Sequence, residues 1–329
     1  MSRKKPQGIG LLSGGLDSLL AVKVHQEQDI DLMGVTFHTP FFGPEPSVST
    51  CPTTGIPLRV IDIGEKHLQM LRNPLYGYGR HMNPCIDCHG LMLREAGRLM
   101  ETIGADFLFT GEVLGQRPMS QRRDSLRSVE KLAGYPGRVL RPLSAKLLTP
   151  TLVELDGLVD RDRLLDIQGR SRKRQVALAE HYGIKSYPQP GGGCMLTSEG
   201  FSARLKELFR SYPKAALRDV EAIKWGRCFR LPTGNICLIG RNQSDNDKLE
   251  SLAGDADFLL RGLDHPGPTG LMLSPSLPGD DLSLAAMIVA AYSDAPPASL
   301  ARVEWKNGPR AGVLLVNKHG KDSFSRYLV

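Results

Sequence analysis

The segment Ser13–Ser18 constrains the fold of this chain more than any other part of the sequence. It reads Ser-Gly-Gly-Leu-Asp-Ser and directly follows the apolar run Ile9–Leu12. The pattern predicts a short buried strand, a glycine turn and a helix over Leu19–Gln26. Such a unit gathers backbone N–H groups and a helix N-terminus around one point, which favours the binding of phosphate. The residues of this expected phosphate site are Ser13, Gly14, Gly15, Asp17 and Ser18.

The order Ser-Gly-Gly-x-Asp-Ser after a first strand resembles the signature of the PP-loop ATP pyrophosphatases. The segment lacks the Gly-Lys-Ser/Thr ending of a Walker loop, and the chain carries no dinucleotide fingerprint. The resemblance implies that ATP is cleaved between its α and β phosphates and that an acceptor is adenylated. It also implies ATP and Mg²⁺ as cofactors, with the adenosine held near Phe37 and Gly111. Asp17 either helps to hold the magnesium ion or caps the helix, and the two roles are compatible.

Strands and helices are expected to alternate along the first part of the chain. The expected elements are strands over Leu32–Phe37, Leu58–Ile63 and Asp106–Thr110, and a helix over Leu91–Ile103 that stops at Gly104. This alternation predicts an α/β fold with a doubly wound parallel sheet, of the adenine nucleotide α-hydrolase-like type. Ligands of such sheets bind beyond the carboxyl ends of the strands. Ser13–Ser18, Phe37–His38 and Gly111–Arg117 are therefore expected to face one crevice.

The chain changes character near Tyr212. A domain boundary is expected at about residue 210, which gives a first domain over 1–209 and a smaller α+β domain over 210–329. A Pro/Ser/Thr-rich loop over Pro40–Pro57 is expected to cover a site, and Pro142–Tyr187 is expected to be mostly helical. The elements expected in the second domain are strands over Val220–Trp225, Cys228–Leu231, Ile236–Ile239 and Val313–Asn317, and an amphipathic helix over Ala285–Tyr292.

The composition narrows the functional class. The chain has 329 residues and no apolar stretch long enough to span a bilayer, so no membrane association is expected. Its basic N-terminus lacks the apolar segment of a signal peptide, and a cytoplasmic location is expected. A net charge of +7 favours an anionic partner, either a nucleotide or a nucleic acid.

Three of the six cysteines have positions that suggest chemistry. Cys85 and Cys88 form a CxxC pair before a helix, and Cys194 follows a glycine loop that begins at Pro190. Three thiolates leave one coordination position open, which favours a working centre over a closed structural site. An iron–sulfur cluster with one unligated iron fits that count. A persulfide on Cys194 that one member of the pair resolves as a disulfide fits it equally.

Simpler roles stay open for the cysteines. Cys85 and Cys88 can instead be half of a structural zinc site that His81 or His89 completes. The remaining cysteines, Cys51, Cys228 and Cys237, are expected to have no catalytic role.

The segment Asn83–Cys88 before a helix, followed by Thr110–Glu112 and then Cys194, resembles the tRNA thiolation branch of the PP-loop family. Members of that branch, such as the 2-thiouridylases, activate a base carbonyl with ATP and replace its oxygen with sulfur. In the 2-thiouridylases the first position of the pair is commonly Asp, whereas Cys85 matches the three-cysteine members that bear a 4Fe-4S cluster. The resemblance implies a sulfur donor protein or inorganic sulfide as a partner. It also implies that the catalytic residues are Cys194, Cys88, Cys85 and Asp17, the three cysteines being the cluster ligands.

The last third of the chain resembles the RNA-binding domain of the NFACT family. The resemblance rests on Trp225–Pro232 and Gly240–Asn242, covers roughly residues 210–329, and implies tRNA or another RNA as a partner. Arginine and asparagine side chains beside a hairpin can contact an RNA backbone and loop bases. The expected contacts are Arg227, Arg230, Arg241 and Asn242. A domain that only braces the enzyme or mediates dimerisation is the alternative.

These features predict an ATP-dependent tRNA or RNA sulfurtransferase that adenylates a base carbonyl and replaces its oxygen with sulfur. One alternative is an amidating ligase or synthetase of the PP-loop family, which has no need of the three cysteines. The other is a non-catalytic RNA-binding adaptor, which the intact loop at Ser13–Ser18 disfavours.

Overall fold

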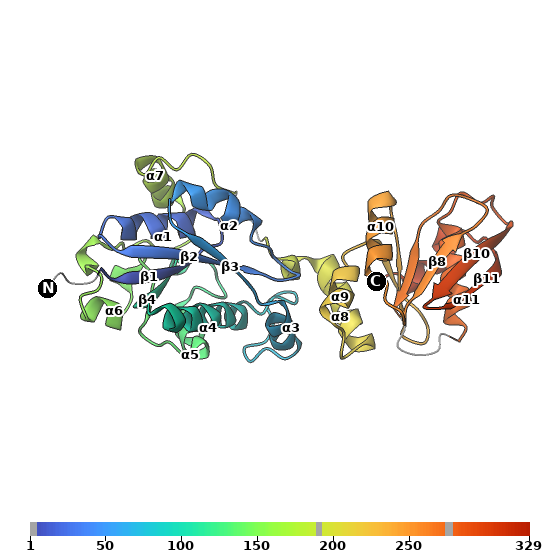
Figure 1. Cartoon of the computed structure of the whole chain (residues 1–329), viewed down its shortest axis with the longest axis horizontal. Helices are drawn as coiled ribbons and strands as arrows, with labels where there is room; N and C mark the ends of the chain where they lie inside the picture. Colours follow the sequence, from blue (N-terminus) through green and yellow to red (C-terminus); the bar gives the residue numbers. More distant parts are fainter. Residues whose placement is uncertain (1–4, 189–192, 274–278) are drawn as a thin grey trace. The chain divides into compact units, whose positions relative to one another are not determined.

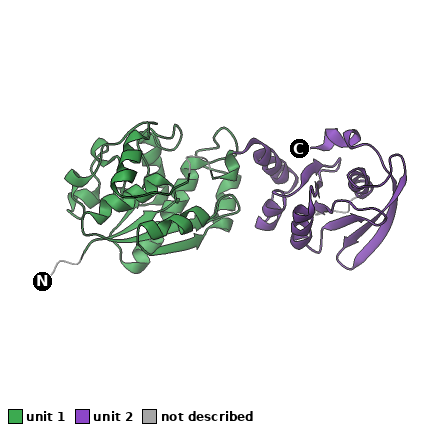
Figure 2. Cartoon of the chain, turned by 90° about the horizontal axis from the view of Figure 1, so that it is seen from above, with its two compact units in different colours: residues 1–197 green, residues 198–329 purple. Residues whose placement is uncertain are grey.

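The chain forms two compact units, residues 1–197 and 198–329, which Figure 2 shows in different colours. The computed structural model describes residues 5–188, 193–273 and 279–329. The units divide between Thr197 and Ser198, before the boundary expected at about residue 210. Helix α8 (Glu199–Ser211) belongs to the second unit because Glu207 forms an ion pair of 2.6 Å with Arg230 of that unit.

The first unit contains a five-stranded parallel sheet with the strand order β3-β2-β1-β4-β5. Its strands are β1 (Gln7–Leu11), β2 (Asp31–His38), β3 (Leu58–Asp62), β4 (Phe107–Thr110) and β5 (Val139–Leu140). The order runs outward from β1 in both directions, so the chain changes direction between β1 and β4. The predicted α/β fold with a doubly wound parallel sheet is confirmed, and its switch point lies at the carboxyl end of β1.

Helices cover both faces of this sheet, with α1, α2 and α7 on one face and α3, α4 and α5 on the other (Figure 1). The helices of the unit are α1 (Leu16–Gln26), α2 (Glu45–Thr50), α3 (Gly64–Arg72), α4 (Cys85–Ile103), α5 (Arg123–Ala133), α6 (Leu152–Leu155) and α7 (Lys173–His181), with 3-10 turns η1 (Cys51–Thr53), η2 (Ala145–Leu147), η3 (Arg161–Arg163) and η4 (Met195–Thr197). Side chains of β4 alternate between the two cores: Phe107 and Phe109 pack with α1, and Leu108 packs with α4. All residues of β4 are buried, which explains its continuous apolar run, whereas the edge strand β3 is largely exposed.

Helix α4 begins earlier than the sequence suggested. Its apolar spacing is evident only from Leu91, but Pro84 precedes the helix and Cys85–Cys88 forms its first turn. The helix ends as expected at Gly104, which adopts the left-handed conformation with φ 68°. The CxxC pair is therefore held rigidly on a helix.

Two other expectations were wrong. The segment Pro142–Tyr187 is mostly irregular, and the two α-helices it contains, α6 and α7, are short. Val220–Trp225 is not a strand, because residues Leu217–Ala222 form helix α9. Val220 and Ile223 are both fully buried three positions apart, which is helical rather than strand spacing.

The second unit is an α+β domain built on a six-stranded antiparallel sheet with the order β11-β10-β8-β9-β7-β6. Its further elements are β6 (Arg227–Arg230), β7 (Ile236–Ile239), α10 (Gln243–Leu252), β8 (Phe258–Gly262), β9 (Gly270–Leu273), α11 (Asp281–Ala291), β10 (Leu300–Asn307), β11 (Arg310–Asn317) and the 3-10 turn η5 (Lys321–Tyr327). The predicted β6–β7 hairpin is confirmed. Helix α11 packs on the sheet and is buried over most of its surface. The expectation that this helix is amphipathic was therefore wrong.

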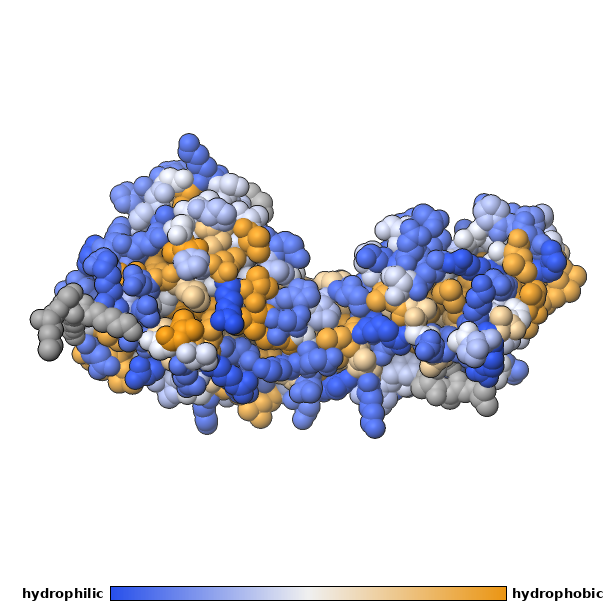
Figure 3. All heavy atoms as spheres, viewed as in Figure 1, coloured by the Kyte–Doolittle hydropathy of each residue, from blue (hydrophilic) through white to orange (hydrophobic). Residues whose placement is uncertain are grey.

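Hydrophilic side chains cover most of the face of the molecule that Figure 3 presents, with smaller hydrophobic areas between them. Within the described ranges, no helix has both the length and the apolar character that crossing a membrane requires.

Candidate functional site

The predicted phosphate loop follows β1 and is braced by α2. Gly14 has a φ of 72°, and a Cβ added to it would lie 2.3 Å from the backbone of Pro46. Both the conformation and the close approach therefore require glycine. The Ser47 hydroxyl donates to the carbonyl of Leu12 at 2.8 Å, which fixes α2 against the loop. Part of the segment expected to cover a site thus lies against the phosphate loop.

The loop leads into the N-terminus of α1. Gly15 is the N-cap residue, and the first turn of any helix leaves backbone N–H groups without partners in the helix. The Ser18 hydroxyl donates to the carbonyl of Gly15 at 2.7 Å, whereas the Ser13 side chain is exposed to solvent. The turn therefore presents the Ser13 hydroxyl and the first N–H groups of α1 to an anion.

Asp17 lies in the first turn of α1 and has one unpaired oxygen. The Gln116 amide donates to its Oδ2 at 2.8 Å, while Oδ1 is buried and has no hydrogen-bond partner in the described part of the chain. Burial raises the pKa of Asp17, although Gln116 and the charges of Arg172 and Arg117 oppose it. A buried carboxylate oxygen without a partner, next to a phosphate loop, fits a magnesium ion.

The end of β4 meets this loop at the switch point of the sheet. A Cβ added to Gly111 would lie 2.5 Å from the carbonyl carbon of Asp17 and from the nitrogen of Ser18. The structure therefore brings Gly111 against the loop, as the sequence predicted. Phe37 lies near the end of β2 with only 4% of its surface exposed, so its ring belongs to the core and only its backbone can serve a ligand. His38 follows it and pairs with Asp62 at 2.8 Å.

Arg172 and Gln175, at the start of α7, lie near Asp17, and the sequence did not predict this. Arg172 precedes α7 and lowers the pKa of Asp17, and its Nε is buried without a partner among the described residues. Gln175 is fully buried and donates to Gln116 at 3.3 Å. The basic run around Arg172 was visible in the sequence, but only the packing of α7 on α1 brings it to the phosphate loop.

The three cysteines singled out in the sequence come together. Burial, followed by the neighbouring thiols of Cys194 and Cys85, raises the pKa of Cys88 well above its ordinary value. Burial and the neighbouring Cys85 raise the pKa of Cys194 to about 11, although a hydrogen bond with the Leu196 backbone opposes the rise. All three are free thiols. Pro190–Gly192 of the preceding glycine loop lies outside the described residues.

His67 of α3 also reaches this site, and the sequence gave no signal for it. Its Nε2 lies 3.3 Å from the sulfur of Cys88. His67 comes to Cys88 because α3 follows β3 and packs on α4. His89, considered as a zinc ligand, instead places its Nδ1 2.9 Å from Glu112.

A metal centre requires several His, Cys, Asp or Glu side chains that converge on one point. Over residues 5–188, 193–273 and 279–329, no group of three or more His, Cys, Asp and Glu side chains is arranged to hold a metal ion. The sulfurs are close enough to influence one another's ionisation, but they do not form a preformed cage. The arrangement described therefore does not fit a cluster without further convergence of Cys85, Cys88 and Cys194.

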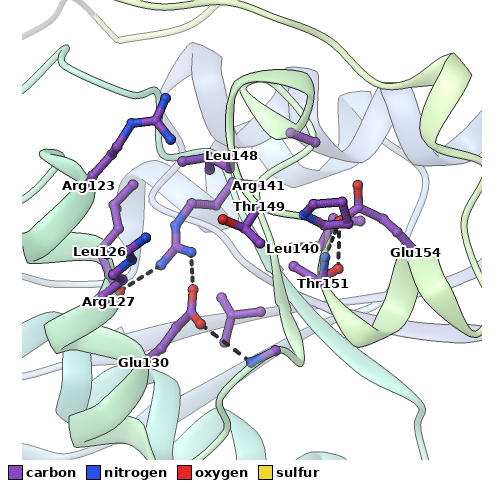
Figure 4. Close-up of a pocket in the computed structure, with 14 residues that line it drawn as sticks. Arg123, Leu126, Arg127, Glu130, Leu140, Arg141, Leu148, Thr149, Thr151 and Glu154 are labelled. Carbon is purple, nitrogen blue, oxygen red and sulfur yellow. Dashed lines mark hydrogen bonds and ion pairs between the residues drawn. The ribbon is translucent and has the colours of Figure 1, made fainter.

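A buried charge network lies beside the end of β4. The Arg141 guanidinium donates to Glu112 at 2.9 Å and also pairs with Glu130. Figure 4 shows Arg141 and Glu130 pointing toward one another in a pocket of about 300 Å³, which Arg123 and Arg127 of α5 also line. Burial alone would raise the pKa of Glu112, but Arg141 and His89 lower it to about 2.

The predicted RNA-binding residues of the second unit have partners within the chain. Arg241 forms a two-point ion pair with Asp245, with its Nε at 2.6 Å and its Nη2 at 3.2 Å from the carboxylate oxygens. Asn242 is the N-cap of α10 and accepts a hydrogen bond from the Asp245 N–H at 2.9 Å. Arg230 pairs with Glu207. These three side chains have structural roles in the protein described.

Arg227 has a different environment. Its guanidinium lies 4.7 Å from the ring centre of Tyr292, and the ammonium of Lys321 lies 5.2 Å from the same ring. Neither cation pairs with a carboxylate in the part of the chain described. Two cations beside one partly exposed aromatic ring combine the two groups that single-stranded RNA uses, which are charge for phosphate and a flat face for a base.

Comparisons with known proteins find similarity to an RNA-binding domain and to a tRNA-modifying enzyme. Residues 226–328 match the family described as NFACT protein RNA binding domain. The tRNA-specific 2-thiouridylase MnmA of Rhizobium rhizogenes is 25% identical over 210 residues, which cover 55% of this chain and 49% of that enzyme. The chain thus spans about half the length of the curated relative it matches.

Three solved structures give only distant matches. The C-terminal part of the fibronectin/fibrinogen-binding protein from Streptococcus suis is 14% identical, with a TM-score of 0.29, and the match covers 48% of this chain and 76% of that one. A predicted subunit of tRNA methyltransferase from Methanocaldococcus jannaschii is 16% identical, with a TM-score of 0.33 and coverage of 42% and 67%. NMN synthetase from Francisella tularensis is 11% identical, with a TM-score of 0.28 and coverage of 57% and 90%.

Because those TM-scores are low, the fold assignment rests on the sheet topology and the loop geometry described above. Residues 226–328 thus match an RNA-binding domain of the NFACT type, and the chain is similar over 55% of its length to a tRNA-specific 2-thiouridylase.

Proposed function

We propose that the chain is an ATP-dependent RNA sulfurtransferase, with tRNA as its RNA. It would transfer AMP to the carbonyl oxygen of a base and then replace that oxygen with sulfur. One observation carries the proposal: Cys194, far along the chain, lies beside Cys85 and Cys88 in the same unit as the phosphate loop. An amidating enzyme that uses the same loop has no need of three neighbouring thiols.

The ATP-binding role is supported by the loop Ser13–Ser18. A base carbonyl oxygen is a poor leaving group, and its conversion to a phosphate ester makes it a good one. The loop N–H groups and the Ser13 hydroxyl would hold the phosphates, and Arg172 and Arg117 would offset their charge. The unpaired Oδ1 of Asp17 would hold a magnesium ion, which supplies charge neutralisation when it is bound.

The sulfur-transfer role is supported by the free thiols of Cys194 and Cys88. In the persulfide route, the outer sulfur on Cys194 bonds to the activated carbon as AMP leaves. The Cys88 thiolate then attacks the inner sulfur of Cys194, and the electron pair of the broken S–S bond stays with the sulfur now on the base. A disulfide between the two cysteines results, and an external thiol must reduce it. A cluster would require Cys85, Cys88 and Cys194 to converge further than they do in the described structure.

The RNA-binding role is supported by the family match of residues 226–328 and by the name of the relative, which acts on tRNA. We propose that Arg227, with Tyr292 and Lys321 beside it, contacts the RNA. Arg230, Arg241 and Asn242 would then act mainly by shaping the surface around it.

The test is reconstitution with purified protein, ATP, Mg²⁺, bulk tRNA, a low-molecular-weight persulfide as the sulfur donor and a thiol reductant, followed by measurement of AMP, pyrophosphate and thionucleosides. Asp17→Ala is expected to abolish AMP formation. Cys194→Ala is expected to spare pyrophosphate release and to stop sulfur incorporation. Cys51→Ala is the matched control, because Cys51 is a buried core cysteine of the same unit. Sulfur incorporation by the Cys194→Ala protein would exclude the proposed role.

A second measurement distinguishes the two forms of the sulfur centre. Protein purified without oxygen that absorbs visible light and contains iron would carry a cluster. Colourless protein whose Cys194 peptide gains the mass of one sulfur after incubation with a sulfur donor would carry a persulfide.

A further inference from the structure

His67 contacts the sulfur of Cys88. Its Nε2 lies 3.3 Å from Sγ of Cys88, and its side chain is completely buried. The rings of Phe41 and Phe42 pack around it, with centroid separations of 5.2 and 5.6 Å. The other ring nitrogen, Nδ1, is buried and has no hydrogen-bond partner among the described residues. The imidazole is therefore held by apolar contacts on its sides and by one sulfur at its tip.

Burial of an imidazole ring is unfavourable unless its nitrogens find hydrogen-bond partners. Removing its two nitrogens from water costs free energy, and each buried polar group without a partner adds to that cost. His25 shows the ordinary solution in the same unit: it is completely buried as well, but its Nδ1 bonds to the carbonyl of Ala21 in its own helix at 2.7 Å. His67 has no such bond to its helix in the structure, and its contact crosses to α4.

The chemistry of the contact defines what it can do. A neutral imidazole carries one N–H and one lone pair, so a proton on Nε2 points at the sulfur and leaves only the Nδ1 lone pair unpaired. An N–H donor of this kind fixes the direction of the sulfur and stabilises negative charge on it. The packing of Phe41 and Phe42 against the imidazole keeps its Nε2 directed at the sulfur of Cys88.

The neighbourhood links this pair to the third cysteine. Phe41, which packs on His67, accepts a hydrogen bond at its backbone carbonyl from the N–H of Met195 at 3.0 Å. Met195 directly follows Cys194. Phe41 therefore contacts His67 through its ring and the segment that carries Cys194 through its backbone carbonyl.

We propose that His67 is a positioning residue that donates from Nε2 to the sulfur of Cys88 and holds it ready to react with sulfur carried by Cys194. The role in sulfur transfer rests on the function proposed above, whereas the effect on Cys88 does not. The hydrogen bond would leave ATP cleavage untouched, since Asp17 and the phosphate loop lie on other elements.

The experiment compares His67→Gln, His67→Asn and His67→Leu with the unchanged protein. The Gln side chain can place an amide N–H near the position of Nε2, whereas the Asn side chain is too short and Leu has no donor. The rate of Cys88 alkylation by iodoacetamide at one fixed pH is followed by peptide mass spectrometry. We expect Asn and Leu to slow it by about tenfold, the equivalent of one hydrogen bond, and Gln to keep it within about threefold.

The controls separate this effect from loss of stability. His25→Leu removes a buried histidine that touches no cysteine in the structure, and it is expected to leave Cys88 alkylation unchanged. Melting temperatures of all variants are measured alongside. Equal Cys88 alkylation rates in the unchanged, Gln, Asn and Leu proteins would overturn the proposal. If Leu fails to fold, the comparison of Gln with Asn decides.

Activity is measured separately, in the reconstituted reaction. Pyrophosphate release with an unchanged KM for ATP, together with an about tenfold lower rate of sulfur incorporation in the Asn variant, would support the full proposal. Sulfur incorporation at the normal rate in that variant would overturn the role in transfer. If no protein incorporates sulfur but alkylation still depends on His67, the sulfurtransferase proposal fails while the control of Cys88 by His67 stands.

Discussion

At the scale of single residues, Asp17 has a carboxylate oxygen whose burial without a partner costs stability. Its Oδ1 is buried and unpaired, and burial raises its pKa. We predict that Asp17→Asn abolishes AMP formation but leaves the free energy of unfolding unchanged within about 1 kcal/mol, because it removes a charge that no bound ion compensates in the free protein. Denaturant unfolding and an AMP assay on the same preparations measure both. A large loss of stability would show that the carboxylate has a structural role.

The effect expected from replacing an arginine of the second unit depends on the groups that the arginine contacts. Arg227 contacts Tyr292 and pairs with no carboxylate among the described residues, whereas Arg241 forms an ion pair with Asp245. We predict that Arg227→Ala weakens tRNA binding and reduces the slope of log affinity against log salt by about one, as expected for the loss of one phosphate contact. Arg241→Ala should lower the affinity less and leave that slope unchanged. Filter binding at several salt concentrations distinguishes them, and equal effects would contradict the assignment.

At the scale of elements, the contact between β4 and the phosphate loop leaves no room for a side chain. A Cβ on Gly111 would lie 2.5 Å from the backbone of Asp17 and Ser18. We predict that Gly111→Ala displaces the loop, lowers the free energy of unfolding by about 1–3 kcal/mol and raises the KM for ATP. Gly200→Ala in α8 is the control, because no atom lies within 4 Å of its added Cβ, and it should be neutral or slightly stabilising.

The helices and strands differ in how well the sequence predicted them. The central strands β1 and β4 are largely apolar runs, and β1, β2, β3 and β4 were predicted within one or two residues. Helix α9 was mistaken for a strand because a six-residue helix offers less than two turns of periodicity. The phosphate loop and the three cysteines were recognised from local patterns. His67, Arg172 and Gln175 were not, since they reach the site only through the packing of α3 and α7.

At the scale of the whole molecule, three buried groups predict sensitivity to acid. Burial lowers the pKa of His25 and of His67 to about 4, below the ordinary 6.5, so the folded state binds fewer protons than the unfolded state between these values. The stability that each histidine contributes is therefore full above pH 6.5 and falls by about 3 kcal/mol as the pH drops to 4. Glu112, with a pKa of about 2 against an ordinary 4.5, adds a further loss below pH 4.5. Urea unfolding at pH 7, 5.5 and 4 measures the slope, which His25→Leu should reduce.

The two units have separate cores. The hydrophobic cluster of the second unit runs from Phe229 to Phe324 and includes no residue of the first. We predict that a fragment of residues 198–329 unfolds in a single cooperative transition and keeps tRNA binding without ATP cleavage. Circular dichroism melting and filter binding test this. A fragment that fails to fold would show that the second unit depends on the first.

The three residues of the turn η4 separate Cys194 from Ser198, where the second unit begins. A force that acts on the second unit is therefore transmitted along the backbone to Cys194 before it reaches any strand of the first sheet. Of the three neighbouring cysteines, Cys194 is thus the one most directly coupled by the chain to the unit that is proposed to bind RNA.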